Sequence, residues 1–182
     1  MSHGLEVQSH QVTPVPRPFA PLAKALAAVN RAMLALSMVA LVIAAAVLTY
    51  SVLSRYFFKA ATDWQDEAAV FLLVGSTFLC GAYVQSYRGH VGIEAVSAIL
   101  PERVNRIRRI LVDILTLAFC AFFAWKSWTL FHEAWVDKQT TSSSWAPPLA
   151  IPYGLMAAGM TLLSVQVALQ VISEALVRRV PR

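Results

Sequence analysis

Four long apolar runs divide the chain, and polar segments separate them. The clearest run, Ala32 to Leu53, contains no charged residue. At 1.5 Å per residue, a helix of this length covers a hydrocarbon core of about 30 Å. The third run is less uniform because Asp113 and Lys126 lie within it. The pattern predicts four transmembrane helices, over residues 32–53, 67–87, 107–131 and 152–176.

The segments outside these runs complete the predicted organisation. Residues 1–24 are polar and proline-rich, which predicts a flexible tail, because proline removes a backbone donor and disfavours helix before it. Between the second and third runs, Val91 to Arg109 mixes apolar residues with Pro101 and four arginines. That mixture predicts a short interfacial helix leading into a basic hinge. We expect a four-span membrane domain over residues 25–178 and a C-terminal tail over residues 179–182.

Composition and charge refine this picture. Apolar residues make up 58% of the chain and charged residues only 14%, against about 25% in globular proteins. The net charge of +5 does not indicate a nucleic-acid partner, because Lys and Arg form short clusters without an aromatic platform. Eleven Lys and Arg residues fall on the side of both termini and four on the other. The positive-inside rule therefore predicts an all-α membrane protein with four transmembrane helices and both termini cytoplasmic.

Few residues suggest chemistry. The sequence has no Ser-His-Asp set, phosphate-binding glycine loop, HExxH or CxxC pattern. None of the four histidines lies in the middle of a predicted span, which argues against a haem-binding anchor. Cys80 and Cys120 lie inside apolar runs, where they behave as small hydrophobes. We expect no catalytic, cofactor-binding or metal-binding residues and no enzymatic activity.

Asp113 is the acidic residue that lies away from the ends of a predicted span, and two interpretations remain open. A charge inside a membrane is costly and often functional, so Asp113 could be the coupling site of a self-sufficient, homo-oligomeric exporter. Alternatively, Arg109 lies four residues earlier on the same helical face and could pair with it. We favour the structural pair.

An ordered set of polar motifs surrounds the second apolar run. In chain order they are Arg-Tyr-Phe from Arg55, Trp-Gln-Asp-Glu from Trp64, the glycines Gly75 and Gly81, Arg-Gly-His from Arg88, and Ile-Glu ending at Glu94. A proline-bearing turn from Ser144 to Tyr153 precedes the last run. Within a four-span plan, this order resembles the small membrane subunit of TRAP transporters, the DctQ-like family. Glu94 departs from the aspartate that is more usual in the family but keeps the charge.

The resemblance implies a non-enzymatic subunit of a tripartite transporter in the bacterial inner membrane. A periplasmic substrate-binding protein would deliver an organic acid anion to a complex of this subunit with a large membrane subunit. The large subunit would carry substrate and sodium by an elevator-like motion driven by an ion gradient rather than ATP. The small subunit would brace its static scaffold within the lipid bilayer.

At the periplasmic turn, the resemblance suggests roles for four residues. Arg55 would pair with Asp66 or Glu67, although all three could instead be independent solvated charges. Trp64 would anchor the turn at the lipid headgroups or touch the binding protein.

Further candidates lie within the second run and at its other end. Gly75 and Gly81 would let a neighbouring helix approach closely, in this subunit or the large one, unless they are simply tolerated in a membrane helix. Arg88 and His90 would fix the cytoplasmic turn, which Glu94 follows, unless that turn is an ordinary solvated loop. The polar groups from Arg55 to Glu67 and those from Arg88 to Glu94 lie on opposite sides of the bilayer and cannot form one active centre. We therefore expect them to be the two ends of a structural brace.

Overall fold

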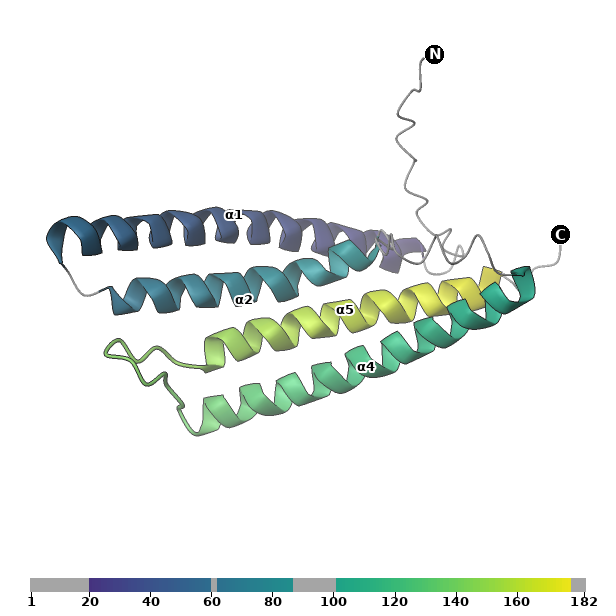
Figure 1. Cartoon of the computed structure of the whole chain (residues 1–182). Helices are drawn as coiled ribbons and strands as arrows, with labels where there is room; N and C mark the ends of the chain where they lie inside the picture. The colour runs from purple at the N-terminus through teal and green to yellow at the C-terminus, as the bar shows by residue number, and fades with distance from the viewer. Residues whose placement is uncertain (1–19, 60–61, 87–100, 178–182) are drawn as a thin grey trace, which may run out of the picture.

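The computed structural model describes residues 20–59, 62–86 and 101–177 of the chain. Regular structure in these residues is helical, with one isolated β-bridge between Thr140 and Pro148. The helices are α1 (Ala20–Phe58), α2 (Asp63–Ser86), α4 (Glu102–Val136) and α5 (Ala150–Val177) (Figure 1). Each is long and apolar enough to cross a membrane, so the expected four-helix membrane architecture is confirmed.

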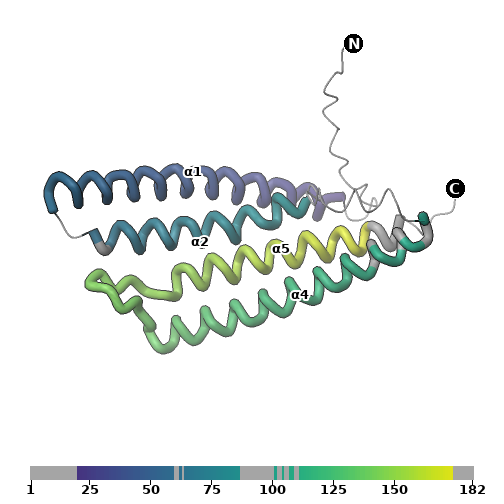
Figure 2. The backbone as a smooth tube through the Cα atoms, in the orientation of Figure 1, coloured from purple at the N-terminus to yellow at the C-terminus, as the bar shows by residue number. Residues whose placement is uncertain are grey.

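The four helices form a layer in the order α1, α2, α5, α4. Helix α1 packs against α2, α2 against α5, and α5 against α4 (Figure 1). The pairs α1–α2 and α4–α5 are antiparallel, whereas α2 and α5 run parallel (Figure 2). The α1–α2 turn and the α4–α5 loop therefore lie at one end of the layer, and the start of α1 and the end of α5 lie at the other (Figure 1).

The two outer helices extend beyond the predicted spans. Helix α1 has 39 residues and includes Pro21 to Arg31 without a break, while α4 has 35 residues. At 1.5 Å per residue these helices are about 58 and 52 Å long, well above a hydrocarbon core of about 30 Å. The arginines expected in a hinge belong to the first turns of α4, and the helix continues beyond the predicted end of the span at residue 131 to Val136. Both outer helices therefore tilt or project from the membrane.

Small side chains fill the seams between helices. Four buried residues of α1 recur every seven positions, the period of a supercoiled helix pair. They are Asn30, Ser37, Ala44 and Ser51. Helix α2 also buries two small residues with the same spacing, Ala69 and Ser76. Short side chains allow the two backbones to approach closely. The resulting van der Waals contacts hold the helices together, because lipid supplies no hydrophobic driving force for their association.

Large apolar side chains of α1 and α4 point outward instead, from Leu36 and Val42 on α1 to Leu115 and Phe119 on α4. This distribution suits contact with lipid or another membrane protein. The predicted interfacial helix falls largely within residues 87–100, outside the described residues, as do Arg88, His90 and Glu94. Those assignments therefore remain predictions.

Candidate functional site

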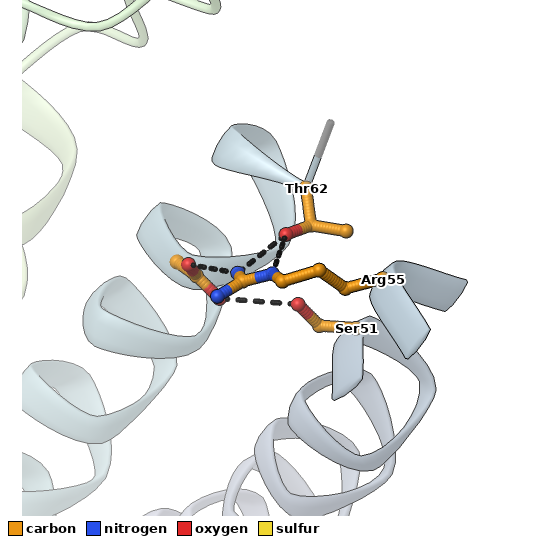
Figure 3. Close-up of polar contacts among 4 residues, drawn as sticks. Ser51, Arg55 and Thr62 are labelled. Atoms are coloured by element: carbon orange, nitrogen blue, oxygen red, sulfur yellow. Dashed lines mark hydrogen bonds and ion pairs between the residues drawn. The ribbon is translucent and has the colours of Figure 1, made fainter. Parts of the chain in front are cut away.

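A polar cluster joins α1 to α2 at their shared turn (Figure 3). The Arg55 guanidinium donates from Nε to the Thr62 hydroxyl at 3.1 Å and from Nη2 to the Asp66 carboxylate at 3.0 Å. The Ser51 hydroxyl, one turn before Arg55, donates to the other Asp66 oxygen at 3.2 Å. Arg55 thus pairs with Asp66, one of the two acids expected from the sequence. Thr62 and Ser51 are partners that the charge pattern did not reveal.

The local sequence explains why these side chains meet. Helix α1 ends at Phe58, and Lys59 takes a left-handed backbone conformation (φ 50°) at the position where helices commonly terminate. After the turn, the Thr62 carbonyl accepts the N–H groups of Gln65 and Asp66 at 3.2 and 3.4 Å. Asp66 therefore lies in the first turn of α2, where a negative charge suits the positive end of the helix dipole.

The Arg55–Asp66 ion pair is largely open to solvent, since its side chains are 61% and 52% exposed. Exposed pairs of this kind contribute only about 0.2–1 kcal/mol. We therefore assign this cluster to the geometry of the turn rather than to the stability of the whole layer.

Loss of either partner of the Arg55–Asp66 ion pair should have a small effect on stability. Arg55→Gln and Asp66→Asn should each lower the thermal unfolding temperature slightly, with a coupling of about 0.2–1 kcal/mol in a double-mutant cycle. The coupling should shrink at high salt because the charges are exposed. Thermal unfolding in detergent at two salt concentrations measures it, with Lys59→Gln as the charge-loss control. A coupling that does not change with salt would contradict an exposed electrostatic pair.

The same end of the layer carries a contact between α2 and the α4–α5 loop. The indole rings of Trp64 and Trp145 meet edge to face, with their centroids 6.4 Å apart. The loop itself is held by a short antiparallel pairing of its backbone. The N–H of Leu149 donates to the backbone carbonyl of Gln139 at 2.9 Å, and the N–H of Thr141 donates to that of Pro147 at 3.1 Å. Both indoles remain about half exposed, so Trp64 can contact lipid headgroups or a partner while it packs on the loop.

Glu67 has a different environment from its neighbour Asp66. One of its carboxylate oxygens is buried, and no donor in the described part of the chain reaches it. The side-chain carbonyl of Gln65 is also buried and also has no donor in the described part of the chain. Glu67 therefore does not join the Arg55 cluster among the described contacts.

The two predicted glycines differ in their surroundings. A Cβ added at Gly75 would come within 2.9 Å of the Leu155 side chain on α5, so this glycine permits close helix packing inside the subunit. A Cβ at Gly81 would meet only Leu163, at 4.0 Å. Packing within this chain therefore does not require a glycine at position 81.

The tightest approach lies at Gly159, which the sequence did not single out. A Cβ there would overlap the backbone carbonyl of Phe78 on α2, with 2.5 Å to its carbon. Real Cβ atoms do not approach so closely, so one helix would have to move. The α2–α5 seam thus depends on glycines in both helices, Gly75 on α2 and Gly159 on α5.

Buried and partly buried amide pairs connect three helices near the opposite end of the layer, and the sequence did not reveal them. Asn30 on α1 donates to the side-chain carbonyl of Gln166 on α5 at 3.0 Å. Gln85 on α2 donates to Gln170 at 3.1 Å, and Gln170 donates back to the Gln85 backbone carbonyl at 2.9 Å. These residues are uncharged, so a search for ionisable groups inside spans passes over them. Uncharged amides within the second and fourth apolar runs, and Asn30 just before the first, were the available signal.

Asp113 and Lys126, two of the charged residues inside the third predicted span, differ in exposure. Asp113 is partly buried on α4, but the side chain of Arg109 lies outside what the structure describes, so their pairing remains a prediction. Lys126 is exposed on the same helix and lies 5.0 Å from the centre of the Trp125 ring. Within the described ranges, no group of three or more His, Cys, Asp or Glu side chains could hold a metal ion.

Comparison with known proteins identifies the family. The model for "Tripartite ATP-independent periplasmic transporters, DctQ component" matches residues 44–177, well over half of the chain. The chain belongs to the DctQ family. It is therefore a transporter component, not a member of an enzyme family, and its four helices indicate a multi-pass membrane protein. Comparisons with curated proteins and with solved structures gave no match.

The DctQ match covers the C-terminal part of α1, from residue 44, and the whole of α2, α4 and α5. It includes the Arg55 cluster, the Trp64–Trp145 contact and the glycines of the α2–α5 seam. Asn30 lies before the matched region, so the amide pair at α1 is a feature of this chain outside the family model.

Proposed function

We propose that this small TRAP subunit braces the large membrane subunit during ion-gradient-driven uptake of an organic acid anion. The DctQ match over residues 44–177 carries the proposal, because this family is the small component of a tripartite, ATP-independent system. In such a system the substrate would reach the membrane complex from a periplasmic binding protein. The large subunit would perform the transport step, with sodium as the expected coupling ion.

The packing within the layer supports a bracing role. Close glycine contacts hold α2 to α5, and buried amide pairs tie α1 and α2 to α5. Interhelical hydrogen bonds and tight backbone packing stabilise membrane helices against relative movement. A subunit built in this way presents a firm surface to a partner that must move substrate across the bilayer.

We further propose that both termini face the cytoplasm and that the α1–α2 turn and the α4–α5 loop face the periplasm. The distribution of eleven Lys and Arg residues against four supports this orientation. It would put the Arg55 cluster and the indoles of Trp64 and Trp145 where the binding protein delivers substrate. The inner membrane of a bacterium is the corresponding location.

Co-expression tests the proposed function. The tagged chain, purified in mild detergent with a co-expressed large TRAP subunit, should recover that subunit in a fixed ratio. Proteoliposomes that contain both subunits should take up an organic acid anion when a sodium gradient and the binding protein are supplied. Either subunit alone should give no uptake. Uptake by this chain alone as a homo-oligomer would contradict the proposal.

Asp113→Asn separates the scaffold from the alternative exporter. For a scaffold, uptake by the complete system should stay within about twofold of the original, because no coupling step passes through this carboxylate. For a self-sufficient exporter with Asp113 as its coupling site, the substitution should abolish transport. Recovery of the large subunit by the variant serves as the control for folding.

A further inference from the structure

A buried amide pair links two helices that are not neighbours in the layer. Helix α2 lies between α1 and α5 and packs against both (Figure 1). The Asn30 side chain on α1 nevertheless donates to the Gln166 side-chain carbonyl on α5 at 3.0 Å. The two residues are only 1% and 8% exposed, so their contact is enclosed within the layer.

This amide pair is only half complete. Two side-chain amides that meet can exchange two hydrogen bonds, because each carries an NH2 group and a carbonyl oxygen. The Asn30 carbonyl oxygen is buried, yet no donor in the described part of the chain reaches it. Exchanging oxygen and nitrogen in both amides would bury an unpaired N–H group instead. Either assignment leaves one polar group of Asn30 unsatisfied by the described residues.

The second amide pair shows complete pairing in a similar environment. Gln170 accepts from the Gln85 side chain at 3.1 Å and donates to the Gln85 backbone carbonyl at 2.9 Å. Both polar groups of the Gln170 amide are therefore satisfied by protein. Gln170 lies one turn after Gln166 on α5 and is 6% exposed, so the Asn30 and Gln170 amides differ in pairing more than in burial.

The unpaired oxygen of Asn30 requires a donor. Buried polar groups in folded proteins are nearly always hydrogen-bonded, and buried water supplies the partner where protein does not. The Gln166 NH2 group makes no hydrogen bond within the described ranges, and it belongs to an amide already in contact with Asn30. A water molecule between them can donate to the Asn30 carbonyl and accept from the Gln166 NH2 group.

The depth of this pair allows water to reach it. Arg31, next to Asn30, is exposed, and the uncharged run from Ala32 to Leu53 begins directly after it. A guanidinium stays near water or the lipid headgroups, because burying its charge in hydrocarbon is costly. Asn30 therefore lies at the boundary of the hydrocarbon core and not at its centre.

We propose that one ordered water molecule is bound between Asn30 and Gln166 and completes the link between α1 and α5. A larger ligand does not fit, because the Asn30 oxygen is fully enclosed. A cation does not fit either, because it needs several oxygen ligands, whereas the Gln166 group beside this oxygen is a hydrogen-bond donor. The site goes beyond the proposed function, since it requires neither the large subunit nor a substrate.

Solid-state NMR of the full chain in lipid bilayers tests the site. The side-chain amide nitrogens of Asn and Gln are isotope-labelled, and magnetisation is transferred to them from water protons. Asn30 should receive this magnetisation at short mixing times, and the fully paired Gln170 should receive several-fold less. The two signals are assigned by their loss from the spectra of Asn30→Leu and Gln170→Leu.

Three outcomes would overturn the proposal. Equally weak transfer to Asn30 and Gln170 would mean that the Asn30 carbonyl is buried without water. Equally strong transfer to both would mean that hydration does not depend on the incomplete pair. A through-space contact between the Asn30 carbonyl carbon and a protein N–H donor would assign the missing partner to the protein. The large subunit is absent from this measurement, so failure to recover it on co-expression would bear only on the proposed function.

Discussion

Gly159→Ala is expected to be the most damaging single-methyl substitution at the α2–α5 seam. The added Cβ would overlap the Phe78 backbone, which cannot move aside as a side-chain tip can. Overpacking of this kind costs about 1–3 kcal/mol, and it should lower the thermal unfolding temperature of the detergent-solubilised chain. Recovery of a co-expressed large subunit should fall as well, because α2 and α5 must shift apart.

Two matched glycines provide the controls. Gly81→Ala places its Cβ 4.0 Å from Leu163, an ordinary contact, so the unfolding temperature should stay the same or rise, since alanine favours helix. Gly75→Ala should lie between these results, because the atom in its way is the end of a flexible leucine side chain, 2.9 Å from the added Cβ. Equal effects of Gly159→Ala and Gly81→Ala would show that backbone contact at this seam does not limit stability.

Gln166→Met is expected to destabilise the chain by leaving the buried amide of Asn30 without its acceptor. Asn30 is only 1% exposed, and its own carbonyl oxygen already has no donor in the described residues. An orphaned buried polar group costs about 1–3 kcal/mol. The unfolding temperature should therefore fall clearly in the single variant.

The double variant Asn30→Leu with Gln166→Met should recover much of that loss. Replacing both partners by apolar side chains removes the unsatisfied groups together with the hydrogen bond, which is often nearly neutral. Thr129→Val serves as a control, since its hydroxyl donates to the Trp125 carbonyl of its own helix and makes no other hydrogen bond in the described ranges. A double variant less stable than Gln166→Met would mean that the hydrogen bond stabilises the fold by more than the free energy needed to bury the two amides.

The sequence predicts the parts of this structure that follow from local pattern. Apolar length gave the four helices, and the charges of Arg55 and Asp66, one on each side of a short turn, gave their ion pair. The boundaries of α4 were harder to predict. Its arginine-rich start and its aromatic end resemble interfacial segments, yet both belong to the helix. Hydropathy locates the membrane core but does not mark where a helix projects from it.

The contacts that depend on helix order could not be predicted. Gly159 stands out only when α5 lies beside α2, and nothing in the apolar runs specifies that α5 separates α2 from α4. The amide pairs could not be predicted for the same reason. Gln85 and Gln170 are 85 positions apart, and they meet only because α5 lies beside α2. Gly81 shows the reverse, because its sequence context suggested a close approach that this chain does not make.

The helix order also bears on how the subunit assembles during synthesis. Helices α1 and α2 form one antiparallel hairpin and α4 and α5 form another, so each hairpin can enter the bilayer as a unit (Figure 1). The two hairpins then associate through α5, which follows the other three described helices in the chain and carries Gly159 against α2 and Gln166 against α1. Correct association is therefore possible only after α5 has been made, and the first hairpin must remain stable in lipid until then.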